Sequence, residues 1–232
     1  MAVTPELLSS FPLLKPLPQE LLSQLAQQSV LRKFSRRGIV LNAGAQEEHI
    51  CFLFEGRLQG VDFTIDGREV GLYFVEPGDF CGELGLFDQG GQPEYIMALT
   101  PAVVVSVPIE SIRGVMLVNA EVVNMLGNKL ASRLRQMTQQ RTLLGLPNVS
   151  QRVCCQLWSL AASESVKNGV CAIQNPPTHQ EIAIMLNVSR ETVTRAFQKL
   201  QNQKIVQRDG PGSLLITSLA ALKELAEGNK EL

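Results

Sequence analysis

The chain has 232 residues, of which 45% are hydrophobic and 19% are charged, a composition that supports two globular domains with separate cores. Residues 1–147 carry 12 Lys and Arg against 15 Asp and Glu, a charge of −3, and residues 148–232 carry 9 against 7, a charge of +2. The basic second half agrees in sign with a phosphate-containing partner but is weak support by itself.

Membrane and secretion signals are missing from the sequence. No basic segment precedes an apolar core at the N-terminus, and the most apolar run, Ile96 to Ile109, is too short to span a bilayer. We therefore expect a cytoplasmic protein without membrane contacts. Five scattered cysteines without CxxC spacing indicate reduced thiols rather than a disulfide framework or a zinc site.

Short strands separated by glycines dominate the first half of the chain. Two leucine-rich amphipathic pieces lie between Pro5 and Gln28, and Asp66-Gly67 is the strongest hairpin signal. Many short strands at regular spacing predict an antiparallel β-roll or barrel. We expect its strands at 50–54, 58–63, 70–75 and 102–107.

The segment from Gly82 to Phe87 places Glu83 at a glycine-flanked turn. Free backbone N–H groups there could form an anion-binding nest beside a carboxylate suited to a ribose hydroxyl. The alternative is a tight turn that Glu83 caps, and residue chemistry alone favours this alternative. Cys81 is interpreted as a small buried side chain rather than a redox-active thiol.

Two helices are expected after Pro108, at 109–118 and at about 120–144. The longer helix has a stripe at spacings of four and three that is typical of a coiled-coil seam. Its partner is either the β-roll of the same chain or a second copy. The stripe consists of Val123, Gly127, Leu130, Leu134, Met137, Arg141 and Leu144.

Two capped helices joined by a short turn organise the second half. Thr178 and Glu181 form a capping box, and Ser189 is a good N-cap for a second helix at about 189–203. Arg190, Glu191 and Arg195 then face outwards. Arg pairs with guanine and Glu with cytosine, so this face can read base edges; the alternative is a surface ion pair between Glu191 and Arg195.

The elements around these two helices complete a winged helix-turn-helix. Gly145 and Pro147 end the long helix, and Asn148 caps the next one. A strand is expected at 170–173, a β-hairpin wing at 205–216 and a last helix at about 219–227. Because reading helices work in pairs on two-fold operators, we favour a parallel homodimer through the seam.

The order of these motifs resembles the CRP/FNR superfamily of bacterial transcription regulators. The resemblance rests on a glycine-rich β-roll, on Gly-Glu-Leu-Gly-Leu-Phe at 82–87, on the long helix and on Ser-Arg-Glu-Thr-Val-Thr-Arg at 189–195. It implies an α+β fold with an N-terminal cyclic-nucleotide-binding-type β-roll, a dimerisation helix and a C-terminal winged helix-turn-helix. The expected domains are 1–118, 119–147 and 148–232.

The resemblance also implies partners and site residues. Double-stranded DNA, a second copy and RNA polymerase are the expected partners. Arg190, Glu191 and Arg195 are expected to read a TGTGA-like half-site. Phosphates are expected at Thr178, Gln180, Ser189 and Thr192. Effector-binding positions fall at Gly82, Glu83, Leu84, Pro93, Glu94, Met137 and Thr138.

The effector site departs from the pattern of the cyclic AMP-binding members. Those members carry an Arg-Ser pair for the cyclic phosphate ten residues after the Glu, where this chain has Pro93 and Glu94. Pro93 thus stands in place of the arginine and Glu94 in place of the serine, so the site loses a positive charge and gains a negative one. This argues against tight cyclic AMP binding and leaves another nucleotide-type effector, or none, as the alternatives.

Other functions receive less support from the sequence. An iron-sulfur sensor needs an N-terminal cysteine cluster, whereas the first cysteine here is Cys51, and His49 is interpreted as a loop residue rather than a haem ligand. No Ser/His/Asp set, metal-ligand cluster or Walker loop supports an enzyme. A non-transcriptional cyclic-nucleotide-binding module remains the main alternative to a DNA-binding regulator.

Overall fold

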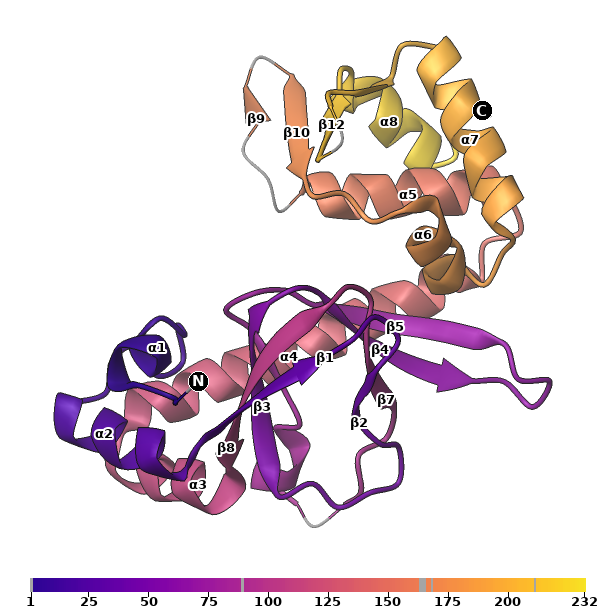
Figure 1. Cartoon of the computed structure of the whole chain (residues 1–232). Helices are drawn as coiled ribbons and strands as arrows, with labels where there is room; N and C mark the ends of the chain where they lie inside the picture. Colours follow the sequence, from indigo (N-terminus) through magenta and orange to yellow (C-terminus); the bar gives the residue numbers. More distant parts are fainter. Residues whose placement is uncertain (1, 89, 163–165, 168, 211) are drawn as a thin grey trace. The chain divides into compact units, whose positions relative to one another are not determined.

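The computed structural model describes residues 2–88, 90–162, 166–167, 169–210 and 212–232. Its chain forms two compact units, one of Met1–Phe63 with Leu72–Met137 and the other of Thr64–Gly71 with Thr138–Leu232 (Figure 1). The predicted fold class is confirmed, because antiparallel sheets form the first unit and a winged helix-turn-helix lies in the second. None of the helices in the described ranges is both long and apolar enough to cross a membrane.

Two four-stranded sheets make up the β-roll of the first unit. One sheet has the order β1 (Val30–Phe34), β8 (Ala102–Pro108), β3 (His49–Glu55), β6 (Phe80–Cys81). The other has the order β2 (Ile39–Leu41), β7 (Tyr95–Ala98), β4 (Leu58–Phe63), β5 (Glu69–Val75). The predicted Asp66-Gly67 hairpin joins β4 to β5, with Gly67 at a φ of +78° and Thr64 N donating to Arg68 O at 3.0 Å.

Alternation along β3 divides the core of this unit into two clusters. Phe52 faces the helices, where it packs 5.1 Å from the Phe11 ring, whereas Cys51 and Leu53 face the second sheet. Successive side chains of a strand point to opposite faces, so a single strand supplies both clusters. The helices on the first face are α1 (Pro5–Ser9), α2 (Gln19–Gln28), α3 (Ile109–Val118) and the start of α4 (Ala120–Leu144).

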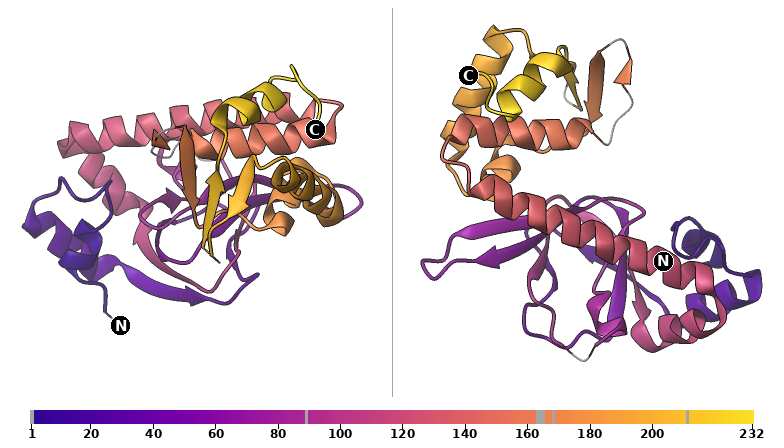
Figure 2. Two further views of the ribbon diagram at one scale, coloured as in Figure 1. Left: turned by 90° about the horizontal axis from the view of Figure 1, so that it is seen from above. Right: turned by 180° about the vertical axis from the view of Figure 1, so that it is seen from behind.

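The bounds of α3 and α4 agree with those expected from the sequence. Figure 2 shows α4 as one uninterrupted helix that runs along the β-roll of the first unit. Val122 and Leu126 are fully buried on one side of it, while Val123, Leu134 and Met137 on the predicted seam are 37%, 68% and 49% exposed. The seam therefore does not face the β-roll of its own chain.

The second unit has the predicted order of helices and strands. Its core lies between α5 (Val149–Ala161), α6 (His179–Leu186), α7 (Arg190–Asn202), α8 (Leu219–Ala226) and a sheet of order β11 (Val206–Arg208), β12 (Ser213–Ile216), β10 (Val170–Gln174), β9 (Val166–Lys167). The predicted wing is present as the antiparallel pair β11 and β12.

The strands missing from the sequence prediction are the shortest ones or lack a clear pattern. Strands β2 and β6 have three and two residues, and the side chains of β1 are exposed or half-buried without regular alternation. The apolar run from Ile96 contains β7 and β8, separated by a turn around Pro101. Runs of this length carry little periodic signal.

Candidate nucleic-acid interface and effector pocket

Side-chain caps fix both helices of the helix-turn-helix. Thr178 Oγ1 accepts a hydrogen bond from Glu181 N at 3.2 Å, and Glu181 Oε2 accepts one from Thr178 N at 2.8 Å, so the predicted capping box is confirmed. Asn187 ends α6 in the left-handed region with a φ of 51°, and Ser189 Oγ accepts from Thr192 N at 3.2 Å to start α7. These caps set the turn between the helices.

The first turns of α7 present charged groups to solvent. Val193, Ala196, Phe197 and Leu200 are buried, whereas Arg190, Glu191 and Arg195 are exposed. Among the described residues no ion pair joins Glu191 to Arg195, contrary to the surface-pair alternative. Hydrogen bonds from its own backbone N–H and from Ser189 lower the pKa of Glu191. Both guanidinium groups and the carboxylate are thus available to a ligand.

His179 connects α6 to the middle of α7. Its Nδ1 lies 3.0 Å from Thr194 Oγ1, and its ring centroid lies 4.4 Å from that of Phe197. Burial, followed by the positive charges of Arg208 and Arg190, lowers the pKa of His179. Thr194 is half-buried, and the imidazole of His179 lies against its hydroxyl.

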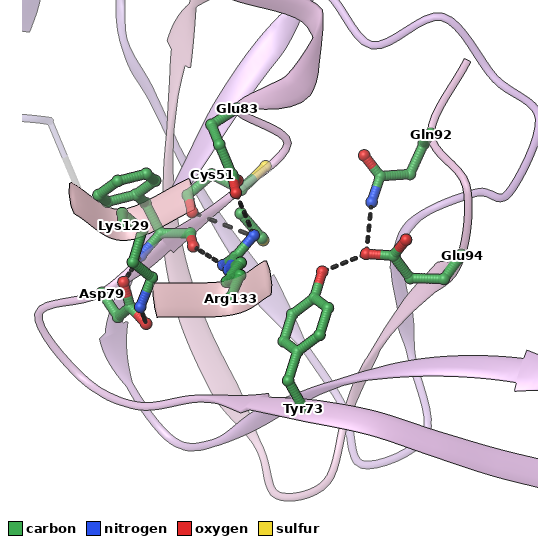
Figure 3. Close-up of polar contacts among 10 residues, drawn as sticks. Cys51, Tyr73, Asp79, Glu83, Gln92, Glu94, Lys129 and Arg133 are labelled. Atoms are coloured by element: carbon green, nitrogen blue, oxygen red, sulfur yellow. Dashed lines mark hydrogen bonds and ion pairs between the residues drawn. The ribbon is translucent and has the colours of Figure 1, made fainter. Parts of the chain in front are cut away.

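The Gly82-Glu83 turn lies against α4 through a buried ion pair. Glu83 is 1% exposed, and its Oε1 accepts from Arg133 Nη1, while Arg133 Nη2 donates to Phe80 O at 2.6 Å (Figure 3). Gly82 has a φ of +84°, a conformation that favours glycine. Glu83 makes no side-chain cap to the 3-10 helix η1 (Leu84–Leu86), so the favoured interpretation as a capping residue was wrong.

Burial dominates the electrostatics of this ion pair. It raises the pKa of Glu83, and the positive charge of Arg133 opposes that shift. The carboxylate of Glu83 raises the pKa of Arg133 against the opposing effect of burial. Glu83 Oε2 has no hydrogen-bond partner among the described residues. An uncompensated charge here would be costly, so each member of the pair depends on the other.

Glu94 forms a second buried cluster in the same unit. Its Oε1 accepts from the Tyr73 hydroxyl and from Gln92 Nε2, the latter at 3.1 Å, and the side chains of all three residues converge in Figure 3. Arg133 links the two clusters, because its guanidinium carbon lies 4.5 Å from the centroid of the Tyr73 ring. Burial raises the pKa of Tyr73, which keeps its hydroxyl protonated as a donor.

The expected effector residues differ in burial. Gly82, Glu83 and Glu94 are buried, whereas Leu84 is 36% and Met137 49% exposed, and Pro93 and Thr138 are also exposed. Arg133, Tyr73 and Gln92 were not predicted. Arg133 belongs to a second stripe of α4 with Val122, Leu126 and Lys129, spaced four, three and four residues apart, which the sequence also shows.

Two family models match this chain, one in each half. A cyclic nucleotide-binding domain model matches residues 31–119, and a Crp-like helix-turn-helix domain model matches residues 151–225, together more than half of the chain. The chain belongs to the CRP/FNR superfamily. It is a DNA-binding transcription regulator of that superfamily.

Two relatives of this CRP/FNR regulator illustrate the similarity. The cAMP-activated global transcriptional regulator CRP of Pasteurella multocida is 29% identical over 181 residues, covering 78% of this chain and 87% of the relative. The cAMP-activated global transcriptional regulator Vfr of Pseudomonas aeruginosa is 28% identical over 183 residues, covering 77% and 86%. Both names describe regulators rather than enzymes.

Solved structures support the CRP/FNR fold. FixK2 from Bradyrhizobium japonicum superposes with a TM-score of 0.72 at 21% identity, covering 85% of this chain and 96% of FixK2. A CooA mutant from Carboxydothermus hydrogenoformans gives a TM-score of 0.73 at 17% identity, covering 86% and 88%. At these identities the likeness concerns the fold alone.

Proposed function

We propose that this chain is a homodimeric, sequence-specific regulator that reads a TGTGA-like palindrome through α7. The supporting observation is the exposed set of Arg190, Glu191 and Arg195 at the start of a capped helix. Arg190 and Arg195 would donate to guanine O6 and N7, and Glu191 would accept from cytosine N4. Thr178, Gln180, Ser189 and Thr192 would contact phosphates and fix the register of α7.

The exposed seam of α4 supports the homodimer. Val123, Leu134 and Met137 expose apolar surface along one side of the helix, while the other side is buried. A second copy that applies the same stripe would cover it in a parallel, two-fold arrangement that suits a palindrome. The division into domains 1–118, 119–147 and 148–232 stays a prediction, and RNA polymerase is the expected protein partner on the promoter.

The effector is not classical cyclic AMP in this proposal. The relatives from Pasteurella and Pseudomonas are named as cAMP-activated, but Pro93 and Glu94 stand where the phosphate-holding Arg-Ser pair is expected. Glu94 is buried and accepts two hydrogen bonds. A phosphate bound there would therefore lie beside a carboxylate. Like charges at a buried site repel, which disfavours an anionic ligand there.

The test begins with selection of an operator from random double-stranded DNA, followed by fluorescence anisotropy at one fixed salt concentration. Arg190→Ala should weaken binding to the selected operator by about 10- to 100-fold and relax the preference at one base position, because one bidentate contact is lost. Binding to unrelated DNA should change much less.

Lys223→Ala is the matched control. The Lys223 side chain is 52% exposed on α8, and its Nζ lies 3.6 Å from Glu227 Oε1. This variant removes one positive charge that does not belong to α7. Its operator affinity should stay within about twofold of wild type. Equal selectivity of wild type, Arg190→Ala, Glu191→Ala and Arg195→Ala would show that α7 does not read bases. Failure to select any sequence would favour the non-transcriptional module.

A further inference from the structure

The polar interior around Arg133 is filled by side chains of this chain. Arg133, Glu83, Tyr73, Gln92 and Glu94 are each less than 10% exposed, with values of 9%, 1%, 7%, 6% and 5%. They come from α4, from the turn after β6, from β5 and from the segment before β7. Figure 3 shows two hydrogen-bonded groups, Glu83 with Arg133 and Tyr73 with Gln92 and Glu94. The contact of the Arg133 guanidinium group with the Tyr73 ring joins the groups, and we call the five side chains together the bonded set.

Tyr73 and Glu94 resemble the two parts of a nucleotide, an aromatic ring and an anion. Tyr73 supplies a planar ring, and the guanidinium carbon of Arg133 lies 4.5 Å from its centroid. Glu94 supplies an anion, held by donors from Tyr73 and Gln92. A bound nucleotide needs the same two kinds of contact: a cation or flat surface against its purine ring, and hydrogen-bond donors around its phosphate.

The Tyr73 ring is closely packed by this chain. A Cβ on Gly60 of β4 would lie 2.8 Å from the Tyr73 ring, so the ring rests directly on the backbone of β4. The guanidinium group of Arg133 also lies over the ring, with its carbon 4.5 Å from the centroid. A surface cavity of about 500 Å³ in the same unit is lined by residues such as Glu47, His49 and Arg113, and by none of the five bonded side chains.

The same set anchors α4 to the β-roll. Arg133 bonds both Glu83 and the Phe80 carbonyl, and Lys129, one turn earlier, pairs with Asp79. We propose that Tyr73 and Glu94 act as an internal ligand, which occupies the nucleotide pocket and holds α4 in its DNA-binding position without a small molecule. This inference rests on the proposed function, because it describes the regulation of the same pocket.

The first experiment needs no variant. The full-length protein is unfolded in guanidinium chloride, dialysed and refolded, and mass spectrometry checks that no nucleotide remains. Its affinity for the selected operator is then measured alone and with 1 mM cyclic AMP, cyclic GMP or cyclic di-GMP. The proposal expects operator binding by the stripped protein and a change below threefold with each nucleotide. A larger gain with any of them overturns it.

Variants of Tyr73 provide the second experiment. Tyr73→Ala removes the ring and the donor to Glu94, and should weaken operator binding at least tenfold. Tyr73→Phe keeps the ring and loses one hydrogen bond, which should weaken binding by about fivefold. Tyr95→Ala is the matched control, because Tyr95 lies on β7 and packs against Phe63 outside the bonded set. Wild-type affinity of both Tyr73 variants overturns the proposal.

Folding is checked separately by thermal melts followed by circular dichroism. If Tyr73→Ala does not fold, the isosteric Tyr73→Phe carries the test. The two proposals fail in different ways. If base reading by α7 is wrong, Arg190→Ala keeps wild-type selectivity. If only the internal ligand is wrong, Arg190→Ala still loses selectivity, but operator binding by the wild type depends on an added nucleotide.

Discussion

The two sides of α4 are an informative contrast, because they reverse the usual places of polar and apolar residues. Arg133 is 9% exposed, and Leu134, the next residue, is 68% exposed. Arginine is rarely buried unless it is paired, and here Glu83 and the Phe80 carbonyl provide the pairing. An exposed leucine in a long apolar stripe instead indicates a surface that another molecule covers. One side of α4 is thus completed within the chain, and the other is the side on which the proposed second copy would pack.

Placing a charge in the exposed apolar stripe of α4 should have the largest effect, on the dissociation of the proposed dimer. Leu134→Glu places a charge in the seam of both copies. Since burying one leucine side chain is worth about 1.5–3 kcal/mol, the loss from two copies should raise the dimer dissociation constant by about 100-fold or more. Analytical ultracentrifugation over a concentration series measures this. The thermal stability of the monomer should hardly change, because the side chain is exposed there.

Leu117→Glu is the control for the seam. Leu117 is 88% exposed on α3 and does not belong to the stripe, so the same substitution should leave the dimer intact. If Leu117→Glu dissociates the dimer and Leu134→Glu does not, the interface lies elsewhere on the surface.

Breaking the buried side should give a stability effect of about 3–5 kcal/mol. Arg133→Ala leaves the Glu83 carboxylate buried without its cation and removes the contact to Tyr73. Urea unfolding followed by circular dichroism should show a lower midpoint. The double variant Arg133→Met with Glu83→Gln removes both charges and should recover part of the loss, since an apolar or neutral pair no longer requires compensation. Equal losses in the single and double variants would contradict the pairing argument.

The contrast also shows how far sequence reasoning reached. The exposed apolar stripe of α4 was visible in the sequence, because Val123, Leu134 and Met137 follow a heptad spacing; its role as a dimer seam stays a prediction. The capping box of Thr178 and Glu181 is a local pattern within four residues. Local patterns of this kind depend on few neighbours, so the sequence alone carries them.

The buried network was not predictable in the same way. Tyr73 and Glu94 are 21 residues apart, and Arg133 and Glu83 are 50 apart, so their meeting depends on how β5, β6 and α4 pack. The change of charge at Pro93 and Glu94 was visible from the resemblance, but the hydrogen-bond donors to Glu94 were not. A second stripe on α4 with Arg133 in it was the one signal available, and it is weaker than the apolar seam because it mixes polar and apolar residues.

Removing the partly exposed ion pair between Lys129 and Asp79 should have the smallest effect on stability. Lys129 pairs with Asp79, but their side chains are 28% and 21% exposed, so water already screens the pair. Lys129→Met keeps the aliphatic packing against the β-roll and removes the charge, and should lower the free energy of unfolding by at most about 1 kcal/mol. A urea midpoint close to that of wild type, and far above that of Arg133→Ala, would place the main anchor of α4 at Arg133. A loss as large as that of Arg133→Ala would instead assign the anchoring of α4 to both cations together, and the contrast between a buried and a screened contact would no longer hold.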